Sequence, residues 1–215
     1  LFVCLILLLP LSALVMQLAE MSWSQYWEVI TNPQVVAAYQ VTLLSAFVAS
    51  IFNGVFGLLM AWILTRYRFP GRTLLDALMD LPFALPTAVA GLTLASLFSV
   101  NGFYGEWLAK FDIKVTYTWL GIAVAMAFTS IPFVVRTVQP VLEELGPEYE
   151  EAAETLGATR WQSFRKVVLP ELSPALLAGI ALSFTRSLGE FGAVIFIAGN
   201  IAWKTDRKST RLNSS

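Results

Sequence analysis

The 215-residue chain is 57% hydrophobic and 13% charged, with a formal net charge of −1. Its mean hydropathy of +0.67 is typical of membrane proteins and argues against a soluble globular domain or a nucleic-acid-binding surface. The chain has no histidine and one cysteine, Cys4, within an apolar run. This argues against a disulfide framework and against a metal or catalytic site built on cysteine or histidine.

Long apolar runs predict five membrane-spanning helices. A helix needs roughly 20 apolar residues to cross a hydrocarbon core of about 30 Å. Four uncharged runs approach that length: residues 1–19, 41–64, 81–100 and 115–135. A fifth run, residues 172–203, is long enough but contains Arg186 and Glu190. We therefore expect an all-α, polytopic membrane protein.

Both ends of the chain depart from this pattern. Residues 1–19 begin within an apolar run, and they lack the charged leading segment and clear cleavage site of a signal peptide, which favours a first span. Polar residues 206–215 continue no preceding pattern, and one choice of codons for them spells a sequencing-library adapter. We interpret them as a non-biological tail, with a genuine polar tail as the alternative. An odd number of spans indicates that a last helix is missing after residue 205.

Basic residues divide unequally between the predicted loops. The loops after the second and fourth runs hold most of them, including Arg66 and Arg165, whereas residues 20–39 have none. Loops rich in lysine and arginine stay on the cytoplasmic side. We therefore predict that residues 148–170, between the fourth and fifth runs, are cytoplasmic.

Residues 148–170 predict two short amphipathic helices joined by a tight turn. Tyr149, Ala152, Ala153 and Leu156 follow the spacing of one helical face. Gly157 then stands where a helix commonly ends in a left-handed residue. A surface loop that lies on the lipid headgroups is the alternative. The acidic residues of the stretch argue against it, because the inner leaflet is itself negatively charged. We expect a helix that docks in a groove of a partner protein.

The second helix of this pair has its own predicted limits. Thr159 and Gln162 match a capping box. Leu169 and Pro170 are expected to end the helix, because the residue before proline avoids the helical region. A new cap at Ser173 is then expected to begin the fifth span.

Seven positions in this stretch resemble the EAA loop of ABC importer permeases, with valine in place of the usual isoleucine: Glu151, Ala152, Ala153, Gly157, Val167, Leu169 and Pro170. The resemblance implies a type I ABC importer transmembrane domain over residues 1–205, truncated at both ends, with five of six spanning helices present. It also implies that residues 144–170 form a cytoplasmic coupling loop that docks into a cleft of a separate ATPase subunit.

Two further segments narrow the resemblance. DLPFALPTAVAGLTL, residues 80–94, and SLGEFGAVIFIAGN, residues 187–200, are similar to the sulfate, molybdate and tungstate branch. Across residues 1–205 the chain closely resembles T-type permease subunits of bacterial sulfate/thiosulfate importers. This implies a multi-pass protein of the bacterial inner membrane that forms the translocation path. Its implied partners are the ATPase, a second homologous permease subunit, a periplasmic sulfate/thiosulfate-binding protein and the lipid bilayer.

The chain contains no G-x-x-x-x-G-K-[ST] phosphate loop. We therefore predict that it is not an enzyme on its own, with no catalytic residue, metal or cofactor site, and that ATP is used by the partner subunit. An alternative from another class is a secondary, ion-coupled anion transporter that uses Arg186 and Glu190. A membrane enzyme is disfavoured because no nucleophile–base set is present.

Arg186 is predicted to lie deep in the membrane. It follows Ser173 by 13 residues, or about 20 Å of helix, and a lone arginine there costs roughly 2.5–3.5 kcal/mol or more. Glu190, four residues on, is within pairing reach on the same helix face. Three interpretations remain open: a pair that merely permits insertion, a pair that faces the translocation path and meets a passing oxyanion, and a contact with a partner subunit.

Other intramembrane residues carry weaker signals. Pro82 and Pro86 predict a bend in the third span, either for packing alone or as a broken, path-lining segment in which Thr87 offers a hydroxyl. Gly54 and Gly57 predict close helix packing. Two acidic residues near the start of the third span are expected to be solvated or capping: Asp76 and Asp80.

Overall fold

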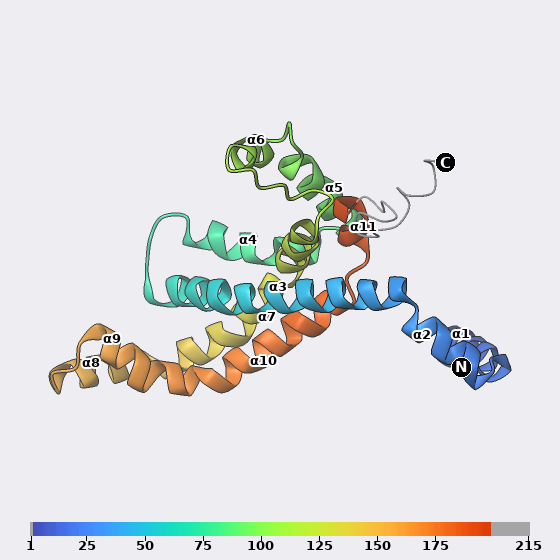
Figure 1. The fold of residues 1–215 in the computed structure, drawn as a ribbon. Coiled ribbons are helices and arrows are strands. Elements are labelled where there is room, and N and C mark those ends of the chain that lie inside the picture. The colour runs from blue at the N-terminus through green and yellow to red at the C-terminus, as the bar shows by residue number, and fades with distance from the viewer. Residues whose placement is uncertain (1, 199–215) are drawn as a thin grey trace. The chain divides into compact units, whose positions relative to one another are not determined.

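The computed structural model describes residues 2–198, and every regular element in that part of the chain is a helix (Figure 1). The described residues form two compact units, divided after residue 41. The predicted tail, residues 206–215, lies outside the described residues.

The first unit contains helix α1, Phe2–Glu20, helix α2, Trp23–Thr31, and the start of helix α3, Pro33–Arg66. Helix α1 covers the first predicted apolar run. Helix α2 begins with a complete capping box, in which the side chains of Ser22 and Gln25 each accept a hydrogen bond from the other residue's backbone N–H.

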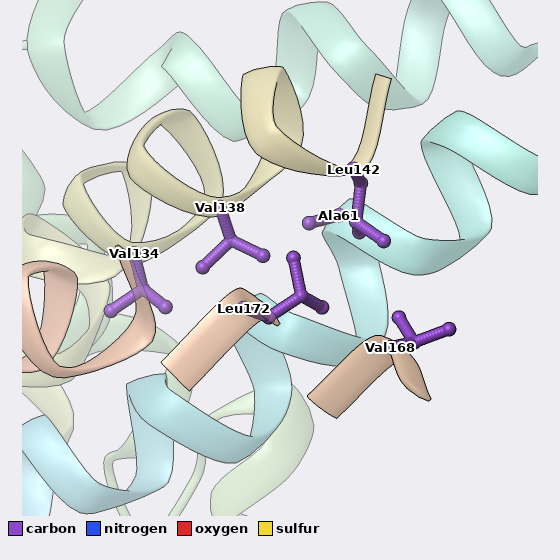
Figure 2. Packing of buried hydrophobic residues seen from close by; sticks show 6 residues of the cluster. All are labelled: Ala61, Val134, Val138, Leu142, Val168 and Leu172. Carbon is purple, nitrogen blue, oxygen red and sulfur yellow. The ribbon is translucent and has the colours of Figure 1, made fainter. Parts of the chain in front are cut away.

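The second unit is built on α7, Trp119–Leu145, and α10, Leu169–Leu188, which run side by side (Figure 1). Helix α3 packs against both through its buried residues. Figure 2 shows the centre of this core, where six side chains gather: Ala61, Val134, Val138, Leu142, Val168 and Leu172. All six are fully buried.

Glycines allow these three helices to approach closely, as predicted. A Cβ atom added to Gly57 of α3 would lie 2.8 Å from Cβ of Val134, and one added to Gly179 of α10 would lie 3.0 Å from Cα of the same valine. A Cβ atom on Gly54 would lie 2.7 Å from Ile180. Real Cβ atoms do not fit at the shorter of these distances, so small residues fix the helix spacing in the core.

The third predicted span is a broken helix. Between helix α4, Arg72–Ala84, and helix α5, Thr87–Phe98, the chain bends by 113°. Leu85 between them has an extended backbone, with ψ of 135°, because Pro86 excludes the helical conformation from the residue before it. Pro82, by contrast, is buried inside α4 without ending it.

The fifth predicted run is also divided, which corrects the expectation of one span over residues 172–203. Helix α10 ends at Leu188, and a separate helix, α11, covers Gly192–Ala198. Residues 199–203 lie outside the described part of the chain. A short helix α6, Phe103–Ala109, stands in the loop after α5.

Length and apolarity identify three candidate spans in the described residues: Pro33–Arg66, Trp119–Leu145 and Arg160–Leu188. The bent pair α4 and α5 makes a fourth if it is counted as one span. These helices and α1 each overlap one of the five predicted runs, and the chain is an all-α, polytopic membrane protein.

Candidate functional site

The predicted helix pair is present in residues 148–168. Helix α8 covers Glu148–Thr155, helix α9 covers Arg160–Ser163, and a π-helix, η1, covers Phe164–Val168. Three glutamates occupy the first turn of α8, where the helix dipole favours negative charge.

The turn between these helices has the predicted geometry. Gly157 adopts φ of +87°, and its N–H donates to the carbonyl oxygen of Glu154 at 2.9 Å. The N–H of Ala158 donates to Ala153 O at 3.0 Å. Thr159 then caps α9 in a complete capping box with Gln162. The turn therefore satisfies backbone groups at the end of one helix and the start of the next.

The predicted stop at Pro170 is wrong. The chain passes from η1 into α10 without interruption, with Pro170 in the first turn of α10. Just before the proline, the N–H of Leu169 donates to Phe164 O, five residues back. This wider π-turn changes the hydrogen-bond register where proline lacks a donor. Ser173 does not cap a new helix, since its hydroxyl donates to Leu169 O at 2.7 Å.

The helix pair carries an exposed apolar face. Leu156 is 89% exposed, Trp161 67% and Tyr149 56%. Of the seven EAA-like positions, Glu151, Ala152, Gly157 and Pro170 are exposed, whereas Ala153, Val167 and Leu169 are half-buried. Large apolar side chains exposed on a short helix pair are typical of a protein-binding surface.

Arg186 and Glu190 form an ion pair, with Arg186 Nη1 2.6 Å from Glu190 Oε2. The expectation that both lie on one helix is wrong, because α10 ends at Leu188. Glu190 lies in the break, and its Oε1 accepts a hydrogen bond from the N–H of Ala193 in α11. The glutamate side chain is 1% exposed and that of the arginine 33%. The carboxylate is therefore fixed, while the guanidinium keeps an open side.

The two helix breaks lie next to each other. A Cβ atom added to Gly192, at the start of α11, would lie 3.0 Å from Cβ of Thr87, at the start of α5. A Cβ atom on Gly91 would lie 2.6 Å from Cα of Ala193. The structure thus brings Thr87 close to the segment that holds Glu190, with Pro86 as the residue preceding α5.

Pro82 lies elsewhere, in the wall of an apolar cavity of about 510 Å³ between α3, α4, α5 and α7. Phe52, Met79 and Phe128 also line this cavity. Pro82, one of the five residues predicted for the translocation path, therefore contributes to the wall of this cavity.

Sequence reasoning missed a charged cluster between α4 and α7. Arg136 of α7 binds both carboxylates of α4, with Nη1 2.7 Å from Asp76 Oδ1 and Nη2 2.6 Å from Asp80 Oδ2. Its Nε donates to the other oxygen of the Asp80 carboxylate, Oδ1, at 2.8 Å. The expectation that these aspartates are merely solvated or capping is wrong. Their i, i+4 spacing was the available signal, since two carboxylates on one helix face favour a shared cation.

A buried polar cluster was also missed. The side-chain Nδ2 of Asn53 in α3 lies 2.9 Å from Ser130 Oγ of α7 and 3.1 Å from Ser183 Oγ of α10. Ser187 extends the cluster, with its hydroxyl 3.0 Å from that of Ser130. All four residues are buried. This cluster joins the three core helices by hydrogen bonds that would have no substitute partners in lipid.

The chain belongs to the family of binding-protein-dependent transport system inner membrane components, whose family model matches residues 53–207. With its all-helical fold, it is a membrane-spanning permease subunit of the ABC importer class. This assignment favours the permease prediction over the alternative of a secondary, ion-coupled transporter.

Individual relatives are similar over nearly the whole chain. The chain is 97% identical over 206 residues to the sulfate transport system permease protein CysT of Escherichia coli strain K12, covering 96% of this chain and 74% of that protein. It is 93% identical, with the same coverage, to the protein of that name from Salmonella typhimurium strain LT2. It is 49% identical over 203 residues to the one from Synechocystis sp., covering 94% of this chain and 71% of the relative.

Proposed function

We propose that this chain is a permease subunit of an ATP-driven importer for sulfate or thiosulfate in the bacterial inner membrane. Its partners are a cytoplasmic ATPase subunit, a second homologous permease subunit and a periplasmic binding protein. ATP is hydrolysed by the ATPase, and this chain supplies no catalytic residue, metal or cofactor site. The substrate assignment is supported by the names of the relatives, which are sulfate transport system permease proteins.

The observation that carries the coupling role is the exposed helix pair of α8 and α9. Ala152 and Leu156 form an exposed, partly small-residue face, which suits a helix laid in a groove of the ATPase. Glu151 and Ala153 belong to the same docking helix. Gly157 sets the turn that presents it.

The remaining three EAA-like residues connect the docking helix to the core. Val167, Leu169 and Pro170 stand where η1 joins α10, beside the buried Val168 and Leu172 (Figure 2). Residues Arg160–Leu188 count as one continuous helical stretch. A displacement of the docking helix by the ATPase is therefore carried along α10 toward Arg186. ATP can bias the permease only if it binds the closed ATPase pair more tightly than the open one.

The translocation path is proposed to pass the adjoining helix breaks. Arg186 meets the passing oxyanion with its open side, and Glu190 limits how tightly the anion is held. Thr87 offers a hydroxyl at the start of α5, and Pro86 and Pro82 shape the broken helix. An arginine beside a fixed carboxylate binds a dianion weakly enough to release it, which a transport path requires.

A cross-linking experiment tests the coupling role. Single cysteines are placed at Ala153 or Thr159 after replacement of the native Cys4, and the assembled complex is treated with a short cross-linker. We expect each cysteine to capture the ATPase subunit. A matched cysteine at Lys110 should not, because Lys110 lies in the loop between the third and fourth predicted spans, on the opposite side of the membrane from residues 148–170. Capture of lipid alone at both positions, or labelling from outside intact cells, would overturn the proposal.

An uptake experiment tests the transport class. The purified complex in proteoliposomes should accumulate sulfate only when the ATPase subunit, ATP and the binding protein are all present. This chain alone, in vesicles with a proton or sodium gradient, should accumulate none. Uptake by the single chain would favour the secondary transporter.

A further inference from the structure

Arg66, the last residue of α3, binds three acceptors on two other elements. Its Nε donates to Glu150 Oε1 of α8 at 2.8 Å. Its Nη1 donates to Leu142 O at 3.1 Å, and its Nη2 donates to Gly146 O at 3.0 Å. The arginine side chain is 13% exposed and that of Glu150 24%, so the group is largely shielded from water.

Two of these acceptors lie at the end of α7. Leu142 is among the last four residues of this helix, whose carbonyl groups lack partners within the helix. Gly146 follows the helix with φ of +65° and turns the chain toward α8. A cation is favoured at this negative end of the helix dipole. Arg66 therefore caps α7 while its third donor holds α8.

Arg66 also contacts the second half of the coupling loop through an aromatic ring. Its guanidinium carbon lies 5.5 Å from the ring centre of Trp62. The tryptophan in turn meets Phe164 of η1 edge to face, with ring centres 5.2 Å apart. One side chain at the end of α3 thus links α7, α8 and, through Trp62, η1.

Close packing does not fill the space around this linkage. A cavity of about 270 Å³ lies beside it, lined by Trp62, Arg66, Pro147, Glu150 and Ser163, among others. The charged contact therefore carries much of the connection between α8 and the end of α3. An arginine that is shielded from water and donates through several of its nitrogens, as Arg66 does, holds its partners more firmly than an exposed ion pair does.

We infer that Arg66 is a positioning residue for energy coupling. It ties the docking helix α8 to the cytoplasmic ends of α3 and α7, so that movement of α8 moves both spans. This linkage is additional to the continuous helix from η1 into α10, which carries movement to a third span. The inference rests on the proposed function, because it assigns Arg66 a role in the transfer of movement from the ATPase.

The test uses the whole complex in proteoliposomes, with the binding protein, and measures ATP hydrolysed per sulfate taken up. Arg66→Gln should raise this ratio about fivefold or more, the lower end of usual coupling between sites. Glu150→Gln keeps the cap on α7 and replaces the ion pair by at most a neutral hydrogen bond, so it should also raise the ratio, by a smaller factor. The double variant should not exceed Arg66→Gln by much, because both substitutions act on one linkage. Arg68→Gln, at an exposed arginine two residues away, is the matched control and should leave the ratio unchanged.

The outcomes separate the inference from the function on which it rests. If the wild-type complex shows no ATP-dependent sulfate uptake, the proposed function fails. If the wild type is active and Glu150→Gln and Arg66→Gln only reduce the amount of assembled complex, with an unchanged ratio, Arg66 is merely a structural cap and the inference is overturned. Because Glu150→Gln leaves the α7 cap in place, it tests the linkage even if Arg66→Gln does not assemble.

Discussion

Gly157 offers a test in which conformation alone is changed. The residue has φ of +87°, and a Cβ atom built on it would meet nothing within 4 Å. A Cβ atom at this position therefore meets no clash, and the main cost of a substitution is that of the left-handed backbone. For an ordinary L-residue this cost is about 1–2 kcal/mol, and it is greater for a β-branched residue.

The substitution Gly157→Val should therefore lower the equilibrium constant for the native turn, relative to other turn conformations, about tenfold or more, since every 1.4 kcal/mol changes an equilibrium constant tenfold. Helix α8 would then be presented to the ATPase in the wrong direction for a larger fraction of the time. We expect sulfate uptake by the reconstituted complex to fall at least several-fold, while basal ATP hydrolysis continues.

Gly157→Asn is the matched control, because asparagine tolerates positive φ far better than valine does. It adds a side chain to the same open space and should retain most of the uptake. The order glycine, asparagine, alanine, valine is the expected ranking of activity. A fully coupled valine variant would refute the assigned role of the turn, as would an asparagine variant as impaired as the valine one.

Three further predictions concern the membrane core. Arg186→Gln should lower sulfate uptake without reducing the amount of assembled complex, and normal uptake would remove Arg186 from the path. Gly57→Ala places a Cβ atom 2.8 Å from Val134 and should cost about 1–3 kcal/mol by overpacking. It should lower the thermal unfolding midpoint of the purified complex, and Val134→Ala in the same chain should restore part of the loss. Asn53→Ala removes a fully buried amide and should cost about 1–3 kcal/mol; an unchanged midpoint in the same assay would contradict the role given to the polar cluster.

The features predicted from the sequence are those governed by nearby residues. The apolar runs became helices because length and hydropathy decide that locally. The left-handed Gly157 and the capping box of Thr159 and Gln162 were predictable because residue type and short-range spacing decide them. The turn and the capping box depend on residues no more than five positions apart, and the helical runs depend on continuous stretches of sequence, so neither needs a contact with a distant segment.

The features that were missed depend on contacts between distant segments. Arg136 binds carboxylates 56 and 60 residues earlier in the chain, and Arg66 binds Glu150, which lies 84 residues later. The i, i+4 spacing of Asp76 and Asp80 indicates a shared cation, but no local pattern identifies the distant residue that supplies it. Pro170 shows the opposite failure, because a strong local rule predicted a helix end there. The π-turn before it supplied the alternative hydrogen-bond register that the rule does not consider.

The error at Pro170 bears directly on the proposed mechanism. Had the helix ended there, a flexible joint would separate the docking helices from the fifth span, and movement of the loop would be absorbed in that joint. A helix that continues from η1 through α10 transmits displacement along its whole length. It ends at Leu188, immediately before the break that holds Glu190. Arg186 lies in the last turn of α10, so a displacement of this helix end moves Arg186. Arg66 acts at the opposite side of the loop, on α3 and α7. If both linkages operate, the three core helices move with the docking helix as one body, and the adjoining breaks beside α5 and α11 are where that movement must be accommodated.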